Sequence, residues 1–455
     1  EAVGWTTYRG DAARSGFSKA PVSETLAPAW TAELGGRLSA LTEADGRLYV
    51  ARVDAHELVA LDSATGRTLW TFTAGGRIDS PPTLWRGRAI FGSADGRVYC
   101  LRASDGALAW RYRAVPRDLR HMAHEQLESV WPVPGNVLVD DGVAHLVAGR
   151  SAFLDGGLRY LRLDAKTGRR LSEAVLDDKD PETGGDLQDR IKILQMPVGL
   201  ADILSSDGRT VFLRSQKFTK EGERLGLGPV SGDAAENAAD QKGTDAHVFA
   251  PFGFLDDTWF HRSYWVFGRS FSGGHNGFFQ AAKNAPAGEI LVHDGEKVFG
   301  YGRKPQYLKW TTPMERQLFA AVKDAEVVKA KGGGPLGKGV LQHPAFLWTA
   351  DIPIFARAMA LSGSTLLVAG PPDFIEEEKA FEALGRKDEA TKRRLAEQDA
   401  ALEGARGAVM RLVSAADGRP LAELRLPSPP VWDGLAVSAG RVFLAGLDGT
   451  IRSFK

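Results

Sequence analysis

The chain has 455 residues, of which 43% are hydrophobic and 25% are charged, proportions that are ordinary for a globular protein. Its 57 lysines and arginines balance 57 aspartates and glutamates, so bulk charge excludes electrostatic recruitment of nucleic acid or of an anionic membrane. No run of about 18 apolar residues occurs, and the sequence therefore predicts no transmembrane segment.

Three similar phrases, each ending in a tryptophan, recur every 40 residues near the start of the chain. They read LAPAW, LDSATGRTLW and LRASDGALAW, and their tryptophans are Trp30, Trp70 and Trp110. In the second and third phrases a glycine stands four residues before the tryptophan, in a turn that needs the positive φ which glycine adopts at little cost. The same glycine turn returns around Gly168 and Gly418.

A second phrase alternates with the first and consists of a tight turn, a short run of alternating apolar residues and another turn. It begins at Asp45, Arg86, Asp141, Ser206 and Ala439, and it predicts short strands joined by turns. Four short strands in about forty residues are typical of a β-propeller blade. We therefore predict an all-β fold, an eight-bladed β-propeller of four-stranded antiparallel blades, with seven blades as the alternative.

The clusters of predicted strands place the blades near residues 38–75, 79–115, 130–176, 196–225, 246–270, 287–320, 355–425 and 431–455. The fifth and sixth clusters are difficult to separate, which is why seven blades stay open. We expect residues 1–455 to form one propeller domain, in which an N-terminal strand around residues 27–34 completes the last blade. Such ring closure leaves no free sheet edge.

Two segments interrupt the repeat. Residues 216–245 are polar and rich in glycine and alanine, so we expect an exposed loop. Residues 374–404 contain no proline and space their apolar residues at three- to four-residue intervals, which predicts a helix or helical hairpin inserted into a blade. The narrow apolar side of this insertion would pack either on the propeller's own rim or on a protein partner.

The tryptophan phrases resemble the PQQ-like repeat, A-x-D-x-x-T-G-x-x-x-W, in which the tryptophan docks between adjacent blades. The opening GWTTYRGDAARSGFS, residues 4–18, resembles the segment that leads into the repeats of quinoprotein alcohol dehydrogenase-like propellers. The resemblance is good over residues 1–175 and 405–455, and the middle third is similar to secreted PQQ-like propellers of the planctomycete type. It implies a periplasmic or extracellular protein, and Glu1 in place of methionine is what removal of a signal peptide would leave.

Members of this family that use the quinone cofactor PQQ pair it with calcium, an aspartate base and, usually, a disulfide between adjacent cysteines. Cys100 is the only cysteine of the chain, so that disulfide cannot form, and its alternating context GRVYCL predicts a buried structural thiol. The sequence shows no calcium and aspartate pattern in the expected context. We therefore expect no cofactor, with PQQ and calcium disfavoured.

The stretch DDTWFHRSYWVFGRSFSGGH, residues 256–275, crowds aromatic, basic and acidic side chains together. Strand alternation places His261 on the face opposite Arg262 and Tyr264, and these three are the candidate catalytic residues. Arginine would neutralise the carboxylate of an acidic sugar while histidine or tyrosine acts as base and acid, which is the chemistry of a lyase. The alternative is a buried arginine–aspartate pair that joins blades. The same stretch holds three candidate ligand-binding residues, Asp257, Trp265 and Arg269.

The segment HMAHEQLESVWP, residues 121–132, holds two further ligand-binding candidates, Glu128 and Trp131. Glu128 stands just before a predicted strand and is a candidate axial carboxylate that would meet Arg262 in space. The two histidines of the segment do not form the H-E-x-x-H pattern, so we expect no metal site.

Basic residues at strand ends are the last group of candidates. Arg150, Lys217 and Arg303 occupy comparable positions and would converge on one mouth of the ring, as a positive site for an anionic small molecule or glycan. Scattered surface basic residues explain the same pattern equally well.

Three functions stay open from the sequence. The one we favour is a binding or scaffold propeller for a ligand or a protein, similar to the PQQ-like assembly factors that bind partner proteins without the cofactor. The alternative is a lyase-type enzyme that acts on an acidic glycan, and a PQQ-dependent dehydrogenase is less favoured. The sequence does not decide whether the protein is catalytic.

Overall fold

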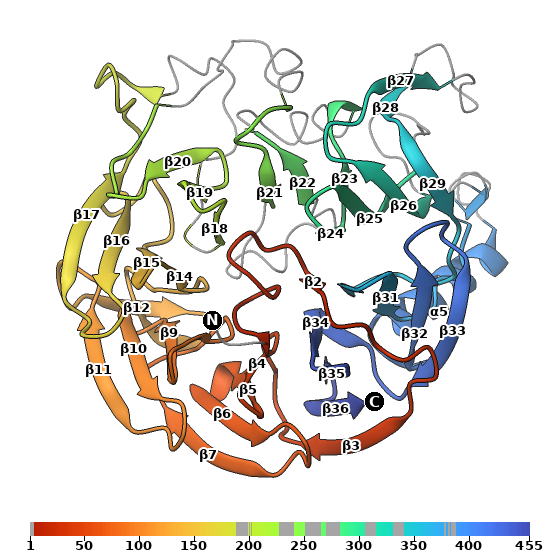
Figure 1. Ribbon diagram of the computed structural model, residues 1–455, viewed down its shortest axis with the longest axis horizontal. Helices are drawn as coiled ribbons and strands as arrows, with labels where there is room; N and C mark the ends of the chain where they lie inside the picture. Colours follow the sequence, from red (N-terminus) through yellow and green to blue (C-terminus); the bar gives the residue numbers. More distant parts are fainter. Residues whose placement is uncertain are drawn as a thin grey trace.

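The computed structural model describes residues 4–187, 199, 201, 203–226, 241–250, 265–269, 283–304, 315–330, 341–376, 379–380, 383 and 388–455. These residues form a ring of eight β-sheets around a common centre (Figure 1). The prediction of an all-β, eight-bladed propeller is confirmed, and seven blades was the wrong alternative. We number the sheets as blades 1 to 8 in chain order.

The first half of the ring holds blades 1 to 4. Blade 1 is ordered β1 (Gly4–Trp5), β4 (Thr42–Ala44), β5 (Arg47–Arg52), β6 (Glu57–Asp62) and β7 (Thr68–Thr73). Blade 2 has β8 (Thr83–Trp85), β9 (Arg88–Ser93), β10 (Arg97–Arg102) and β11 (Leu108–Arg113). Blade 3 has β14 (Leu138–Asp140), β15 (Val143–Ala148), β16 (Leu158–Asp164) and β17 (Arg170–Leu176), and blade 4 has β18 (Leu204–Ser206), β19 (Thr210–Leu213) and β20 (Gln216–Thr219).

The second half holds blades 5 to 8. Blade 5 has β21 (His247–Phe249), β22 (Trp265–Gly268) and β23 (Ala287–Gly288), and blade 6 has β24 (Ile290–His293), β25 (Lys297–Arg303), β26 (Arg316–Val322) and β29 (Phe346–Ala350). Blade 7 has β2 (Phe17–Ser18), β30 (Ala358–Ser362), β31 (Thr365–Gly370), β32 (Ala408–Ser414) and β33 (Pro420–Leu426). Blade 8 has β34 (Pro430–Ser438), β35 (Arg441–Gly446), β36 (Thr450–Phe454) and β3 (Pro28–Glu33), and β3 pairs antiparallel with β36.

Several of the described elements lie outside the regular blades. Two hairpins are formed by β12 (Arg120–Ala123) with β13 (Gln126–Ser129) and by β27 (Val327–Ala330) with β28 (Leu341–Pro344). A short 3-10 helix, η1 (Val53–Ala55), follows β5, and the helix α5 (Glu389–Leu402) lies between β31 and β32. The sixth cluster of predicted strands ends at residue 320. The outer strand of blade 6 lies beyond that residue because the second hairpin precedes it in the chain. The predicted loop 216–245 also differs, since its first four residues form β20.

The predicted helical insertion contains α5. The side chain of Asp388 caps its N-terminus by accepting a hydrogen bond from the backbone N–H of Thr391 at 2.9 Å. The side chain of Gln398 accepts from the backbone of Phe374 and donates to the carbonyl oxygen of Pro372, so the helix packs on its own blade. In the described part of the chain, no helix is both long and apolar enough to cross a membrane.

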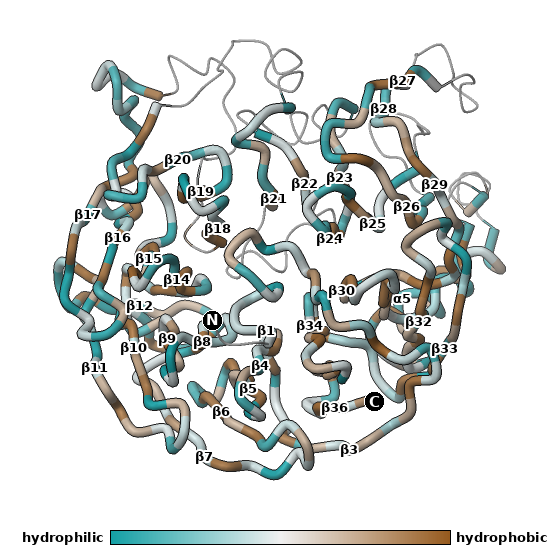
Figure 2. The backbone as a smooth tube through the Cα atoms, in the orientation of Figure 1, coloured by the Kyte–Doolittle hydropathy of each residue, from teal (hydrophilic) through white to brown (hydrophobic). Residues whose placement is uncertain are grey.

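Burial along the strands follows from their place in a blade. In β5 the four central residues are consecutively buried, because an inner strand is covered by a neighbouring blade on each side. The outer strand β7 has no fully buried residue, and its partly buried residues stand between exposed threonines. Figure 2 shows hydrophobic and hydrophilic residues mixed along the outer strands. The core of the protein therefore consists of the blade-to-blade contacts.

Four joints between blades repeat one contact. Between blades 8 and 1, the indole Nε1 of Trp30 donates a hydrogen bond to the carbonyl oxygen of Ser63 at 3.1 Å. A Cβ on Gly66 would lie 2.5 Å from Cε3 of the same indole, so only glycine lets the ring lie against the turn. The other three joints use the pairs Trp70–Gly106, Trp110–Gly168 and Trp348–Gly418.

Residues 4–18, which we call the N-terminal plug, lie at the centre of the ring (Figure 1). Strand β1 pairs with β4 of blade 1, and β2 pairs in parallel with β30 of blade 7. The plug also accepts backbone hydrogen bonds at the inner ends of blades 2, 4 and 6, from the N–H groups of Leu84, Ser206 and His293. The plug thus pairs with inner strands of blades 1, 2, 4, 6 and 7.

Two buried arginines fix the plug in place. Arg14 is fully buried, and its Nε donates to the carbonyl oxygen of Leu204 at 2.7 Å in blade 4. Arg9 forms a 2.7 Å ion pair with Asp433 of blade 8, and its guanidinium lies 4.2 Å from the ring centre of Trp265 in blade 5. Because each buried charge has fixed hydrogen-bond acceptors, the central charges hold the blades together rather than repelling them.

Substitution of Gly66 tests the tryptophan joints. We expect Gly66→Ala to lower the free energy of unfolding by about 2–4 kcal/mol, because a left-handed φ of 76° and the clash with Trp30 act together. The control is Gly46→Ala, where φ is 73° but a Cβ would meet nothing within 4 Å, so we expect a loss of about 1 kcal/mol. Urea denaturation measures both, and equal losses would contradict the joint.

Two buried histidines predict acid sensitivity. Burial lowers the pKa of His145 and of His293 from 6.5 to about 4. Between these values the unfolded chain binds protons that the folded chain does not, so stability falls as the pH drops from 6.5 to about 4, by up to about 3 kcal/mol for each histidine. The urea midpoint of His145→Gln should fall less over this window than that of the wild type. An identical fall would rule out His145 as a contributor.

Candidate functional site

The β12–β13 hairpin is the clearest departure from the blade pattern in the first half of the ring. Met122 pairs with Leu127 across the hairpin, and His121 pairs with Glu128. The turn between the strands is formed by His124 and Glu125, both with positive φ, which is the backbone that a tight hairpin needs. The two histidines of this segment are therefore part of a hairpin and its turn.

The hairpin buries a carboxylate and exposes apolar side chains. Glu128 is 1% exposed, whereas Met122 is 68% and Leu127 is 54% exposed. A strand that packed on the propeller for its own stability would place the apolar residues inward and the charge outward. The reversed arrangement requires ionic partners beneath the hairpin, and it leaves an apolar surface exposed to solvent above it.

Two arginines supply the partners of Glu128. Its Oε1 lies 2.9 Å from Nη1 of Arg77, and its Oε2 lies 2.5 Å from Nη2 of Arg150. Arg77 also donates from Nε to Asp79 at 2.7 Å, and burial raises the pKa of Asp79 while the charge and hydrogen bonds of Arg77 oppose that rise. The four residues form a neutral set, which we call the buried ionic network.

The ionic network joins three separate segments. Arg77 and Asp79 lie between β7 and β8, Glu128 lies in β13, and Arg150 follows β15. The tip of the hairpin is held separately, because the side chain of Gln126 lies 2.6 Å from the ring Nε2 of His56, beside η1 of blade 1. The hairpin is thus anchored at its base and at its tip.

Trp131 connects the hairpin to the loop that follows β15. Its indole Nε1 donates to the carbonyl oxygen of Asp155 at 3.0 Å, and the N–H of Gly149 donates to the carbonyl oxygen of Pro132. This loop adds two exposed apolar side chains, and a third precedes β12. We call the exposed Met122 and Leu127, which pair with each other on the side opposite Glu128, the apolar face.

The structure brings the predicted ligand-binding residues together in two groups. Glu128 and Arg150 meet in the ionic network, with Trp131 beside them. Lys217 and Arg269 meet at Asp245, at 2.8 Å and 2.7 Å. Although burial raises the pKa of Asp245, hydrogen bonds from both cations outweigh it and hold the pKa at about 2.

The other predicted residues are dispersed or lie outside the described part of the chain. Trp265 is buried in β22 against Arg9, and Arg303 ends β25. Four predicted residues lie outside the described residues: Asp257, His261, Arg262 and Tyr264. The lyase-type cluster, and its contact with Glu128, therefore stay predictions.

Arg77 and Asp79, which complete the ionic network, are not among the residues predicted from the sequence. Their only local signal is an R-x-D pattern between a glycine pair and a serine–proline pair, in GGRIDSPP. A charged pair in a segment that connects two strands is ordinarily exposed, and only the hairpin folded over it makes it buried.

The described residues do not fit the quinone cofactor of related propellers. Cys100 is fully buried in β10, and burial raises the pKa of its thiol to about 12. Among the residues with described positions, no three His, Cys, Asp or Glu side chains are placed to hold a metal ion.

Comparisons with known proteins agree with the fold. A family model described as outer membrane protein assembly factor BamB matches residues 18–218. BamB of Burkholderia pseudomallei is 30% identical over 135 residues, and the quinone alcohol dehydrogenase subunit of Gluconobacter oxydans is 27% identical over 140 residues. These matches span 26% and 28% of this chain but only 35% and 17% of those relatives.

A solved structure extends the likeness to the whole ring. The quinohemoprotein alcohol dehydrogenase of Comamonas testosteroni superimposes on 99% of this chain and 80% of its own, with a TM-score of 0.58 at 14% identity. At that identity the likeness shows the fold alone. The tryptophan–glycine joints, the eight blades and these matches make the chain similar to the PQQ-like β-propellers.

Proposed function

We propose that this chain is a periplasmic binding propeller whose partner is a protein that docks on the apolar face. The observation that carries the proposal is the reversed hairpin, with Glu128 buried and Met122 and Leu127 exposed. The match to BamB, a protein described as an outer membrane protein assembly factor, supports a role in binding other proteins.

Binding energy on this face would come from covering apolar side chains. Burial of a methionine or leucine side chain contributes about 1.5–3 kcal/mol relative to leaving it in water. The anchors at Glu128 and Gln126 hold the hairpin in one position, so a partner would not need to order it on binding. The exposed part of α5, by contrast, is mainly charged, which favours the hairpin over the 374–404 insertion as the docking surface.

The docking surface can be tested by cross-linking in cells of the native host. We expect a photoreactive residue at position 122 or 127 to form one adduct of constant mass, and the same residue at the exposed Leu347 of β29 to form none. The double variant Met122→Glu/Leu127→Glu should then bind the purified partner at least tenfold more weakly, whereas Leu347→Glu should not change binding. Adducts of equal yield at position 347 would overturn the proposal.

Neutralisation of Glu128 tests the anchor. We expect Glu128→Gln to lower the free energy of unfolding by about 3 kcal/mol, because Arg77 and Arg150 would keep their charges without this carboxylate. Glu423→Gln, which breaks a half-exposed pair with Arg411, should lower it by less than about 1 kcal/mol.

Hydrogen exchange separates the local effect from the global one. In Glu128→Gln and without urea, the backbone amides of β12 and β13 should exchange faster by a larger factor than those of β5, whose rates follow the global loss of stability. Unchanged exchange in the hairpin would mean that the ionic network does not position the apolar face.

A further inference from the structure

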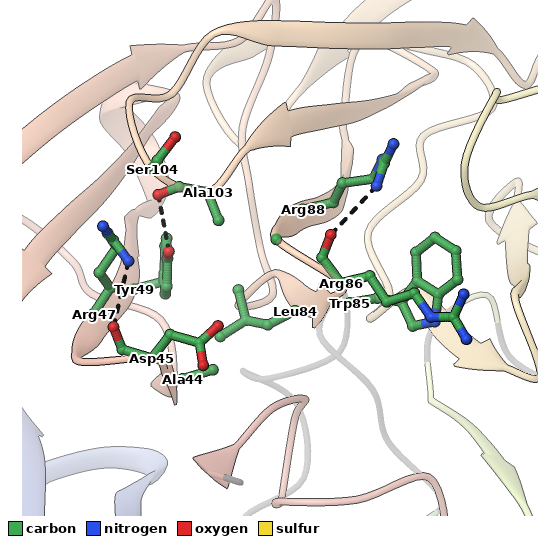
Figure 3. Close-up of a pocket in the computed structure, with 11 residues that line it drawn as sticks. Ala44, Asp45, Arg47, Tyr49, Leu84, Trp85, Arg86, Arg88, Ala103 and Ser104 are labelled. Atoms are coloured by element: carbon green, nitrogen blue, oxygen red, sulfur yellow. Dashed lines mark hydrogen bonds between the residues drawn. The ribbon is translucent and has the colours of Figure 1, made fainter. Parts of the chain in front are cut away.

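A second site lies between blades 1 and 2, away from the ionic network. A pocket of about 150 Å³ opens between the β4–β5 turn and the β8–β9 turn. In Figure 3, Asp45, Arg47 and Tyr49 form one wall, Trp85, Arg86 and Arg88 form the other, and Leu84 lies between them. Both walls are the same turn of the repeat, x-G-R, in neighbouring blades.

The repeated turn explains the geometry of the walls. Asp45 and Arg86 both adopt positive φ, followed by Gly46 and Gly87. In each wall the arginine after the glycine folds back, and its Nη1 donates to the carbonyl oxygen of the first turn residue at 3.3 Å. Two equivalent arginines, Arg47 and Arg88, are therefore held on opposite sides of one pocket.

The arginines of this pocket lack carboxylate partners. Within the described residues, none of Arg47, Arg86 and Arg88 forms an ion pair, and the Nε atoms of Arg47 and Arg88 are buried without an acceptor. This differs from Arg150, Lys217 and Arg269, each of which is paired with an acid. The one carboxylate in the lining belongs to Asp45, so the lining carries a net charge of about +2.

Trp85 holds the second wall in place. The guanidinium carbons of Arg86 and Arg88 lie 5.2 Å and 5.8 Å from the centre of its ring, within the range of cation–π attraction. The hydroxyl of Tyr49 donates to the carbonyl oxygen of Ala103 at 3.1 Å and is satisfied within the protein. The hydrogen-bond donors that remain for a ligand are therefore mainly the N–H groups of the guanidinium groups.

We propose that this pocket binds a small tetrahedral oxyanion, a phosphate or sulfate group, either free or as a monoester. Guanidinium groups bind such groups through paired N–H donors, and a lining that holds three arginines and one acid favours a multiply charged oxyanion over a single carboxylate. The site is independent of the protein-binding face, because no residue is shared between them.

Titration calorimetry with inorganic phosphate, repeated at several fixed ionic strengths, tests the proposal. We expect saturable binding that weakens as the salt concentration rises, and an at least fivefold loss of affinity in Arg88→Gln. The matched control is Arg441→Gln, which changes the same turn position in blade 8, outside the pocket, and should leave affinity unchanged. Asp45→Asn should raise the affinity severalfold, because it removes the one negative charge of the lining.

Glycerol 3-phosphate, with glycerol as the neutral control, distinguishes a monoester from the free anion. Tighter binding of the monoester than of inorganic phosphate would assign the site to esters, and equal or weaker binding would assign it to the free anion. Absence of saturable phosphate binding to the wild type, or an equal loss in Arg441→Gln, would overturn the proposal. A rise of affinity in Asp45→Asn is a result that a purely structural role of these residues would not produce.

Discussion

The contact between the N-terminal plug and the inner strands is the interaction on which the other features depend. Residues 4–18 bind blades around the ring through backbone hydrogen bonds, and Arg9 and Arg14 extend those contacts to Asp433 and Leu204. Inner strands that met only water or one another would leave polar groups without fixed partners at the centre. With the plug in place the blades hold constant positions, and the turns and hairpin on them are presented at constant distances.

The hairpin and the pocket between blades 1 and 2 differ in whether their charges are paired. Around the hairpin, two arginines and two acids form a neutral buried set, so its contribution is to position the apolar face rather than to attract an ion. Between blades 1 and 2, the arginines meet no acid within ion-pair distance among the described residues, and their charge is available to a ligand. A chain of zero net charge can therefore carry a local anion site.

Much of the fold was predictable from the sequence, and the contacts that were not predicted have identifiable physical causes. The glycine turn at Gly418 was found from its phrase, but its partner Trp348 was not, because the β27–β28 hairpin separates Trp348 from the rest of blade 6. Glu128 and Arg150 were both singled out, but their contact with each other was not. Arg77 was missed because nothing in its neighbours along the chain shows that a hairpin covers it.

The sequence by itself determined the all-β blade repeat, the glycine turns of the tryptophan phrases and the buried state of Cys100, because each depends on turns and alternations within about forty residues. Only the tertiary structure decided which basic residues are neutralised. Lys217, predicted as a strand-end cation, and Arg269, predicted as a ligand-binding residue, both form ion pairs with Asp245. Arg47 and Arg88 lie on opposite sides of one pocket, and neither forms an ion pair with a described residue. Ion pairing depends on distances between blades, and no local pattern of residues contains those distances.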